Sequence, residues 1–193
     1  MVEPTDEALP RALVVDDERE VADAYALRLR GVCDVETAYD GEAALRAVDD
    51  RRIDVVLLDR HMPGLSGDEV LERLEERDFP GRIVMITAID PGFDILDMPF
   101  DDYLCKPVDR EDVQAAVTHQ CTILGYETLG EYFGVESKRR VVAAELSADE
   151  CNAHDEYQAL ETSARDLEQR ARRLLTDTPE ILSAFENVDR ESK

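Results

Sequence analysis

The sequence lacks the features of a secreted or membrane-spanning protein. Its four cysteines are scattered and form no Cys-x-x-Cys pair, so free, buried thiols in a reducing compartment are expected. No apolar run approaches the roughly 18 residues of a membrane-spanning helix. The segment from Met1 to Pro10 has neither the basic flank nor the apolar stretch of a signal peptide. We therefore expect a cytoplasmic protein without a membrane partner.

Lysine is also scarce, and the charge balance is strongly acidic. Only three of the 22 basic residues are lysines, against 46 Asp and Glu, which gives a formal net charge of −24. Such a chain repels itself in dilute buffer, whereas at about 1 M salt the Debye length falls to about 3 Å and the repulsion fades. Many carboxylates with few lysines resemble the proteins of extremely halophilic microbes. An acidic protein of an ordinary organism with Arg-biased codons is the alternative.

Apolar runs and helical spacings alternate through the first two thirds of the chain. Because strands that alternate with helices form parallel sheets covered on both faces, we predict a doubly wound α/β fold with five strands and about five helices. Proline and glycine at Pro91, Gly92 and Pro99 predict that the helix between the last two strands is short. The expected strands are 11–15, 32–37, 53–58, 82–87 and 101–104, and the main helices are 21–30, 41–48, 68–77 and 108–124.

Polar side chains stand at the ends of these predicted strands. Asp16 and Asp17 follow the first strand, Asp59 the third, Thr87 ends the fourth, and Lys106 follows the fifth. Sites in such sheets form beyond the carboxyl ends of the strands. Carboxylates gathered there raise one another's pKa unless a cation intervenes, and Mg²⁺ prefers oxygen ligands and bridges to phosphate. A carboxylate nucleophile, a metal, a lysine and a hydroxyl together suit phosphoryl transfer.

The motifs around these residues resemble the receiver domain of two-component response regulators, over about residues 10–124. The resemblance implies a flavodoxin-like, CheY-like fold in which Asp59 accepts a phosphoryl group from a phosphohistidine of a sensor histidine kinase. The motifs are Asp16-Asp17, Leu57-Leu-Asp59-Arg-His-Met-Pro63-Gly, Met85-Ile-Thr87-Ala and Tyr103-Leu-Cys-Lys106-Pro107.

The resemblance also implies a set of Mg²⁺ ligands. Asp17 binds the ion directly and Asp16 mainly through water, while Asp59 and the main-chain carbonyl of His61 complete the protein ligands. Phosphatases of the haloacid dehalogenase type share a strand-end Asp with Mg²⁺, but they need a second Asp two residues after the nucleophile, where this chain has His61. An enzyme that turns over free substrate is therefore not expected.

Four further roles follow from the same resemblance. Lys106 and Thr87 hold the phosphoryl group, and Tyr103 turns inward when Thr87 moves toward the phosphate. The Lys106–Pro107 peptide is expected to be cis. Each residue also has a plainer interpretation, because Asp16 and Asp17 could be helix caps and Tyr103 a half-buried core aromatic.

Residues 126–193 form a second, helical region. Ser147-Ala-Asp-Glu150 matches a capping box and predicts a helix of roughly 28 residues, about 42 Å long. Gly125, Gly130 and Gly134 weaken the helical pattern before it. An antiparallel hairpin is our interpretation, and a single helix that pairs with a second chain is the alternative. The helix has an apolar seam of Ala153, Tyr157, Leu160, Ala164, Leu167, Ala171 and Leu174.

This region resembles the HalX domain that follows receiver domains in halophilic archaea, from Tyr126-Glu-Thr-Leu to Asp155-Glu-Tyr-Gln-Ala-Leu-Glu. The resemblance implies transcriptional regulation. Two basic clusters, Lys138-Arg139-Arg140 and Arg170-Ala-Arg172-Arg173, are flanked by acidic residues without a recognition-helix pattern. DNA is therefore a possible partner that the charge does not support, and a phosphorylation-controlled protein interaction or a homodimer through these helices stays open as well.

The net charge predicts a steep salt dependence of stability. Melting followed by circular dichroism should show a midpoint temperature that rises from dilute buffer to molar KCl, because salt screens the repulsion among the 46 acidic side chains. A midpoint that stays flat over this range would rule out the halophilic interpretation.

Overall fold

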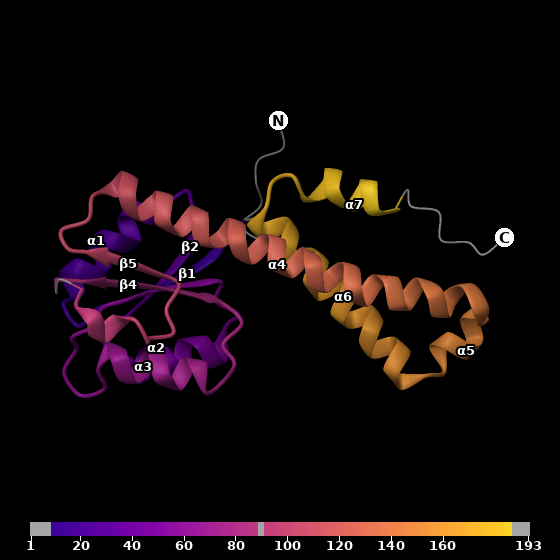
Figure 1. The fold of residues 1–193 in the computed structure, drawn as a ribbon, viewed down its shortest axis with the longest axis horizontal. Coiled ribbons are helices and arrows are strands. Elements are labelled where there is room, and N and C mark those ends of the chain that lie inside the picture. The colour runs from indigo at the N-terminus through magenta and orange to yellow at the C-terminus, as the bar shows by residue number, and fades with distance from the viewer. Residues whose placement is uncertain (1–8, 89–90, 187–193) are drawn as a thin grey trace. The chain divides into compact units, whose positions relative to one another are not determined.

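The computed structural model describes residues 9–88 and 91–186, and the chain divides between Cys121 and Thr122 into two compact units (Figure 1). The first unit contains a five-stranded parallel sheet in the order β2-β1-β3-β4-β5. The strands are β1 (Arg11–Val15), β2 (Asp34–Ala38), β3 (Val55–Leu58), β4 (Arg82–Thr87) and β5 (Asp102–Cys105).

Helices cover both faces of this sheet. In Figure 1, α2 and α3 lie on one face, and α1 and the first turns of α4 lie on the other. Side-chain caps fix where two of these helices begin, because the Asp40 carboxylate accepts the Ala43 N–H and Ser66 forms a capping box with Glu69. The predicted doubly wound α/β fold is confirmed. The helices are α1 (Arg19–Leu29), α2 (Gly41–Asp50), α3 (Gly67–Glu75) and α4 (Arg110–Glu145).

The helix between β4 and β5 is as short as the prolines predict. The described part of this segment, residues 88 and 91–101, forms one 3₁₀ turn, η2 (Phe93–Ile95), and no longer helix. Phe93 and Leu96 are consequently 92% and 75% exposed. Three of the four cysteines are buried as expected, whereas Cys105 is exposed at the end of β5.

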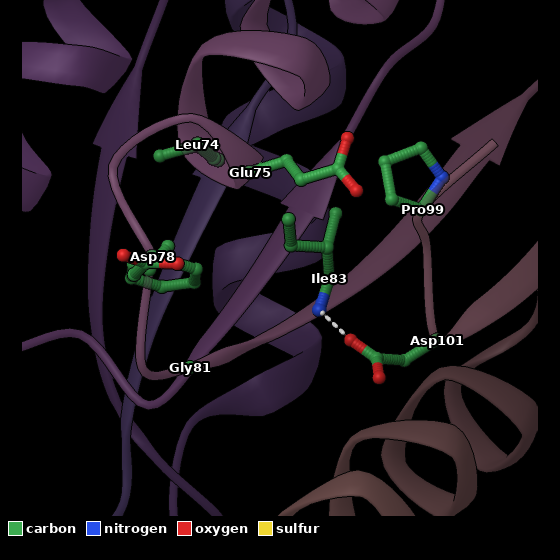
Figure 2. Close-up of a pocket in the computed structure, with 8 residues that line it drawn as sticks. Leu74, Glu75, Asp78, Gly81, Ile83, Pro99 and Asp101 are labelled. Carbon is green, nitrogen blue, oxygen red and sulfur yellow. Dashed lines mark hydrogen bonds between the residues drawn. The ribbon is translucent and has the colours of Figure 1, made fainter.

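Carboxylates accept backbone hydrogen bonds at the amino ends of two strands, β1 and β4. Asp54 Oδ2 accepts the Arg11 N–H (2.9 Å), and Asp101 Oδ2 accepts the Ile83 N–H (2.7 Å). A pocket of about 230 Å³ lies at this edge beside the end of α3, lined by Glu75, Asp78, Asp101 and apolar side chains (Figure 2). It lies at the opposite end of β4 from Thr87, so it is separate from the predicted site.

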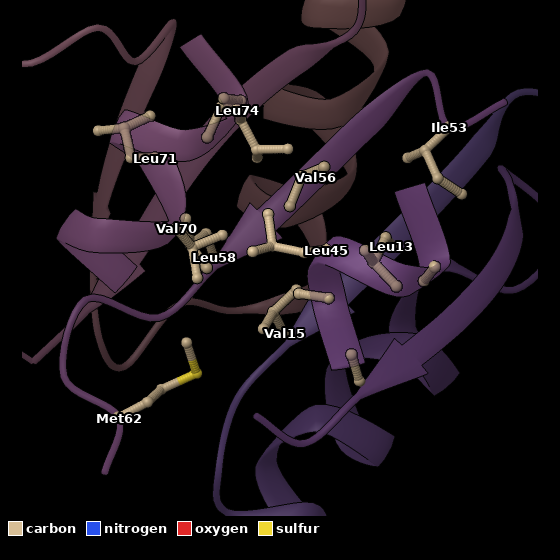
Figure 3. Packing of buried hydrophobic residues seen from close by; sticks show 14 of the residues in the cluster. Leu13, Val15, Leu45, Ile53, Val56, Leu58, Met62, Val70, Leu71 and Leu74 are labelled. Carbon is tan, nitrogen blue, oxygen red and sulfur yellow. The ribbon is translucent and has the colours of Figure 1, made fainter. Parts of the chain in front are cut away.

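One continuous apolar core packs α2 and α3 onto the sheet (Figure 3). Alternate strand residues such as Leu13, Val15, Val56 and Leu58 belong to it. The residues between them are also almost fully buried on the opposite face. Burial on both faces explains why these strands are continuous apolar runs rather than alternating ones.

The second unit is an antiparallel helical hairpin with an added helix. The residues of α4 after Cys121 are followed by α5 (Ala148–Asn152), α6 (Asp155–Leu174) and α7 (Thr178–Glu186). Arg139 lies beside Tyr157 (3.4 Å), whereas Gly125 lies beside Leu175, so α6 runs back along α4. The hairpin interpretation is confirmed. In the described ranges, no helix combines the length and apolar character that crossing a membrane requires.

The prediction of one helix of roughly 28 residues after Ser147 is wrong. The Ser147–Glu150 capping box is present, but it begins only the five residues of α5. The chain then turns at Ala153 and His154, and α6 begins at Asp155 with 20 residues. This short turn buries Cys151, and Asn152 at its end has low helix propensity.

Most of the predicted apolar seam nevertheless faces the interior. Ala153 precedes α6 and is exposed, and Leu160 is half-buried. The remaining positions are buried: Tyr157, Ala164, Leu167, Ala171 and Leu174.

The expected weakening of the helix at its three glycines is also not observed. α4 is continuous over 36 residues, from Arg110 to Glu145. A glycine costs about 1 kcal/mol in a helix interior, but the buried side chains of Leu129 and Tyr132 hold this segment in place. Gly125 has a packing role, because a Cβ there would lie 2.5 Å from Cγ of Leu175.

The three glycines of α4 should therefore respond differently to alanine. Gly130→Ala and Gly134→Ala meet no atom within 4 Å, and each should stabilise the protein by about 0.5–1 kcal/mol through helix propensity. Gly125→Ala should lower the melting temperature. Overpacking against buried Leu175 costs about 1–3 kcal/mol, which exceeds the gain in helix propensity. Thermal melts in high KCl measure all three. Equal stabilisation by Gly125→Ala would contradict the close contact.

Candidate functional site

Backbone hydrogen bonds between neighbouring strands bring the predicted residues to one edge of the sheet. The Asp59 N–H donates to the Val15 carbonyl (2.9 Å), which places Asp59 next to Asp16. The Lys106 N–H donates to the Thr87 carbonyl (2.7 Å). The carboxyl ends of β1, β3, β4 and β5 therefore meet at a single site, as expected of a doubly wound sheet.

The Lys106 ammonium lies between two buried carboxylates. Its Nζ is 2.6 Å from Asp16 Oδ2 and 2.7 Å from Asp59 Oδ1. The two acidic residues are only 1% and 6% exposed. Burial by itself lowers the pKa of Lys106, but hydrogen bonds from Lys106 to both carboxylates outweigh it and raise the pKa above its usual value. The lysine is therefore held as a cation at the centre of the site.

The second oxygen of each carboxylate is held by the backbone. Asp59 Oδ2 accepts the His61 N–H, and Asp16 Oδ1 accepts the Glu18 N–H, both at 2.9 Å. The His61 side chain itself is exposed. Four contacts thus fix the orientation of the two carboxyl groups.

The loop after Asp59 folds back against it at a glycine. The Gly67 N–H donates to the Arg60 carbonyl (2.9 Å), and a Cβ on Gly67 would lie 2.1 Å from the Asp59 carbonyl oxygen. Any larger residue would push the loop away from the site. Arg60 adds a paired contact, because its Nε donates to both oxygens of Asp68 (3.0 and 3.2 Å). The sequence does not indicate this contact, because it depends on how the loop between β3 and α3 folds.

The three carboxylates expected to hold Mg²⁺ are not gathered as a metal-binding group. Among residues 9–88 and 91–186, no three His, Cys, Asp or Glu side chains are arranged to hold a metal ion. Asp16 and Asp59 share the Lys106 ammonium instead, and Asp17 is half-buried. Together with Asp17, the three carboxylates against one ammonium leave two negative charges that a divalent cation would balance, so this oxygen donor set fits Mg²⁺.

Thr87 and Pro107 lie at the same edge, whereas Tyr103 lies two residues before the end of β5. Thr87 is 1% exposed at the end of β4. Tyr103 on β5 is half-buried, and its ring lies 5.5 Å from that of Phe100. The Lys106–Pro107 peptide is cis.

The basic cluster on α4 of the second unit is paired within the helix. Glu136 is 4% exposed and accepts hydrogen bonds from Arg139 (2.7 and 2.8 Å) and from Arg140 (2.7 Å). Burial alone raises the pKa of Glu136, but the two arginines outweigh it and lower the pKa below its usual value. Arg140 also lies over the ring of Phe185 on α7, 5.3 Å from its centroid.

The second basic cluster is also largely committed to the fold. Arg170 is buried, at 4% exposure, and Arg172 pairs with Glu168 (2.7 Å). Arg170 and Arg172 are therefore engaged within the unit, which agrees with the acidic residues that flank these clusters in the sequence.

Comparisons with known proteins match both units. The model of the response regulator receiver domain matches residues 12–118, and the model of the HalX domain matches residues 122–189. A Haloferax volcanii protein whose name suggests transcriptional regulation is 48% identical over 127 residues, covering 65% of this chain and 22% of that protein. The transcriptional regulatory protein CutR of Streptomyces coelicolor is 40% identical over 111 residues, covering 55% and 51%.

A solved structure agrees with the sequence relatives. The BeF3-activated receiver domain of DrrB, a Thermotoga maritima protein, aligns with a TM-score of 0.53 at 26% identity, covering 57% of this chain and 96% of that one. The chain spans about a fifth to a half of the length of the two curated relatives. It belongs to the family of two-component response regulators, with a receiver domain followed by a HalX domain.

Proposed function

We propose that Asp59 accepts a phosphoryl group from a phosphohistidine of a sensor histidine kinase and thereby switches the helices that follow the receiver domain. The observation that carries this proposal is the Lys106 ammonium, held within 2.7 Å of both Asp16 and Asp59. A buried carboxylate with a cation beside it is ready to act as a nucleophile toward a phosphoryl group. We place this chemistry in the cytoplasm, where the kinase would meet its regulator.

In the proposed transfer, one carboxylate oxygen of Asp59 forms a bond to phosphorus while the P–N bond of the phosphohistidine breaks. The imidazole nitrogen keeps the electron pair, and Asp59 becomes an acyl phosphate. Lys106 pairs with one phosphoryl oxygen, and the Thr87 hydroxyl donates to another. Positioning and charge neutralisation supply most of the catalysis in phosphoryl transfer. In this proposal the chain uses them to phosphorylate its own Asp59 and does not turn over a free substrate.

Mg²⁺ would be held by Asp16, Asp17, Asp59 and the main-chain carbonyl of His61. When bound, the ion neutralises charge between the carboxylates and the phosphoryl oxygens. Lys106 would then leave the two carboxylates and turn toward the phosphoryl group. Asp17 would turn inward to complete the ligand set, because Asp16 and Asp59 alone give too few protein oxygens.

The switch would pass through Thr87 and Tyr103. Thr87 moves toward the phosphate, and the half-buried Tyr103 ring turns inward into the space it leaves. A ligand shifts a protein between two states only by its differential affinity, and such couplings are typically about 1–3 kcal/mol. We therefore expect a modest change in the C-terminal helices rather than refolding.

For the output we propose transcriptional regulation through protein contacts. The pairing of Arg139 and Arg140 with buried Glu136 favours this over direct DNA binding, because paired guanidinium groups release fewer counterions from DNA. The region from residue 126 to 193 also carries a net charge of −7. A second copy of the chain is one partner that these helices could bind.

The acceptor assignment predicts the behaviour of Asp59→Asn. With Mg²⁺ and acetyl phosphate, the parent protein should gain one base-labile phosphoryl group, detected by mass spectrometry of the intact chain. Asp59→Asn should lose it, because an amide is not a nucleophile toward phosphorus. Asp50→Asn, the same change at an exposed position of α2, is the matched control and should label fully. Equal labelling of Asp59→Asn would sink the assignment.

The output proposal predicts the mass of the full-length protein in molar KCl. Light scattering should give the same mass with and without duplex DNA, because the α4 arginines are paired internally. Beryllofluoride should raise the mass if the switch controls self-association. A DNA complex that disappears in Arg139→Gln would instead favour direct DNA binding.

A further inference from the structure

We infer that Arg28, at the end of α1, is a positioning residue for Lys106. Its guanidinium donates a hydrogen bond to the main-chain carbonyl of Val108, two residues after Lys106. This inference rests on the proposed function, in which Lys106 binds the phosphoryl group. The contact joins residues 80 positions apart, both within the first unit.

The direction of the Arg28 side chain follows from helix geometry. Side chains on a helix lean toward its amino end, and α1 begins beside the Asp16–Asp17 loop at the carboxyl edge of the sheet. Arg28 therefore extends from the last turn of α1 back toward the edge where Val108 lies. Its guanidinium also lies over the ring of Tyr25, 5.0 Å from the centroid. Because Tyr25 is buried, this ring limits the positions that the guanidinium can adopt.

A second hydrogen bond runs in the opposite direction between the same segments. Gln114 Nε2 on α4 donates to the Arg28 carbonyl at 2.6 Å. That carbonyl lies in the last turn of α1, where the helix has no backbone donor left to offer. The end of α1 and the start of α4 are thus tied together at two points, and Val108 between them is 6% exposed.

Anchoring Val108 also restricts where the backbone of Lys106 can lie. Only Pro107 separates the two residues, and its ring fixes its own φ. Lys106 must extend from the end of β5, across the end of β4, to reach Asp16 and Asp59. Since a misplacement of about 1 Å can cost on the order of 100-fold in rate, the anchoring of the segment that follows Lys106 bears on phosphoryl transfer.

The two halves of the proposed site should respond differently to loss of Arg28. Phosphoryl binding uses Lys106, whereas Mg²⁺ binding uses the carboxylates of Asp16, Asp17 and Asp59. Removing the anchor should therefore weaken the phosphoryl contact and leave the metal contact nearly unchanged. A change that only destabilised the fold would weaken both together.

The test compares full-length Arg28→Met, Arg28→Lys and Arg51→Met in high KCl. Arg28→Met should lower the rate of labelling by acetyl phosphate by about tenfold and weaken beryllofluoride binding by a similar factor, with the Mg²⁺ Kd within about twofold. Arg28→Lys should recover part of both, because an ammonium still donates to Val108. Arg51→Met is the control, since it removes the same charge from surface pairs with Asp34 and Glu36.

A second readout needs no phosphorylation. The chain has only three lysines, so ¹³C relaxation can resolve the Cε group of Lys106 from that of exposed Lys138. In Arg28→Met, the motion of Lys106 should increase while that of Lys138 stays constant. Unchanged Lys106 motion, or a proportional loss of Mg²⁺ and beryllofluoride binding, would overturn the inference. A parent protein without label on Asp59 would refute the proposed function, while the Lys106 motion would still decide the role of Arg28.

Discussion

The site depends on one ammonium group that compensates two buried carboxylates. Asp16 and Asp59 end neighbouring strands, so the sheet order forces them together. Two carboxylates this close do not both stay ionised in a buried place without a cation. Lys106 supplies it from the edge strand β5, across the end of β4, a span of about 10 Å between strands. The long lysine side chain and the two aspartate side chains together close this distance, and the Lys106 backbone N–H donates to the Thr87 carbonyl.

The backbone around the site holds Asp59 and Lys106 in the positions that this charge compensation requires. The β3–α3 loop approaches Asp59 so closely that position 67 accepts only glycine. The segment after Lys106 is tied to the end of α1 by Arg28 and Gln114. Helix α1 begins just after the Asp16–Asp17 loop and ends at this tie. One helix therefore connects the loop that carries Asp16 and Asp17 with the segment that follows Lys106.

In the second unit, a buried carboxylate is likewise compensated by cationic side chains, here from the same helix. Glu136 is buried, and Arg139 and Arg140 at the next turn compensate it. Truncating one partner of such a group leaves an uncompensated buried charge, which is strongly destabilising. These arginines thus serve the packing of the unit, which accounts for basic clusters in a domain of net negative charge. Most of the excess acidic side chains are left to the surface, where salt screens their mutual repulsion.

The sequence by itself determined the alternation of strands and helices, the short segment between β4 and β5, and the strand-end positions of Asp16, Asp59, Thr87 and Lys106. These features depend on local periodicity and proline content, which the chain carries residue by residue. The division of the C-terminal helices was predicted less well, because propensity alone does not show that Leu129 and Tyr132 hold α4 together through its glycines. Only the tertiary structure decided that Lys106 lies between Asp16 and Asp59, that Gly67 touches Asp59, and that Arg28 binds Val108. Each of these contacts joins segments separated along the chain, and their distances follow from how the strands and helices pack.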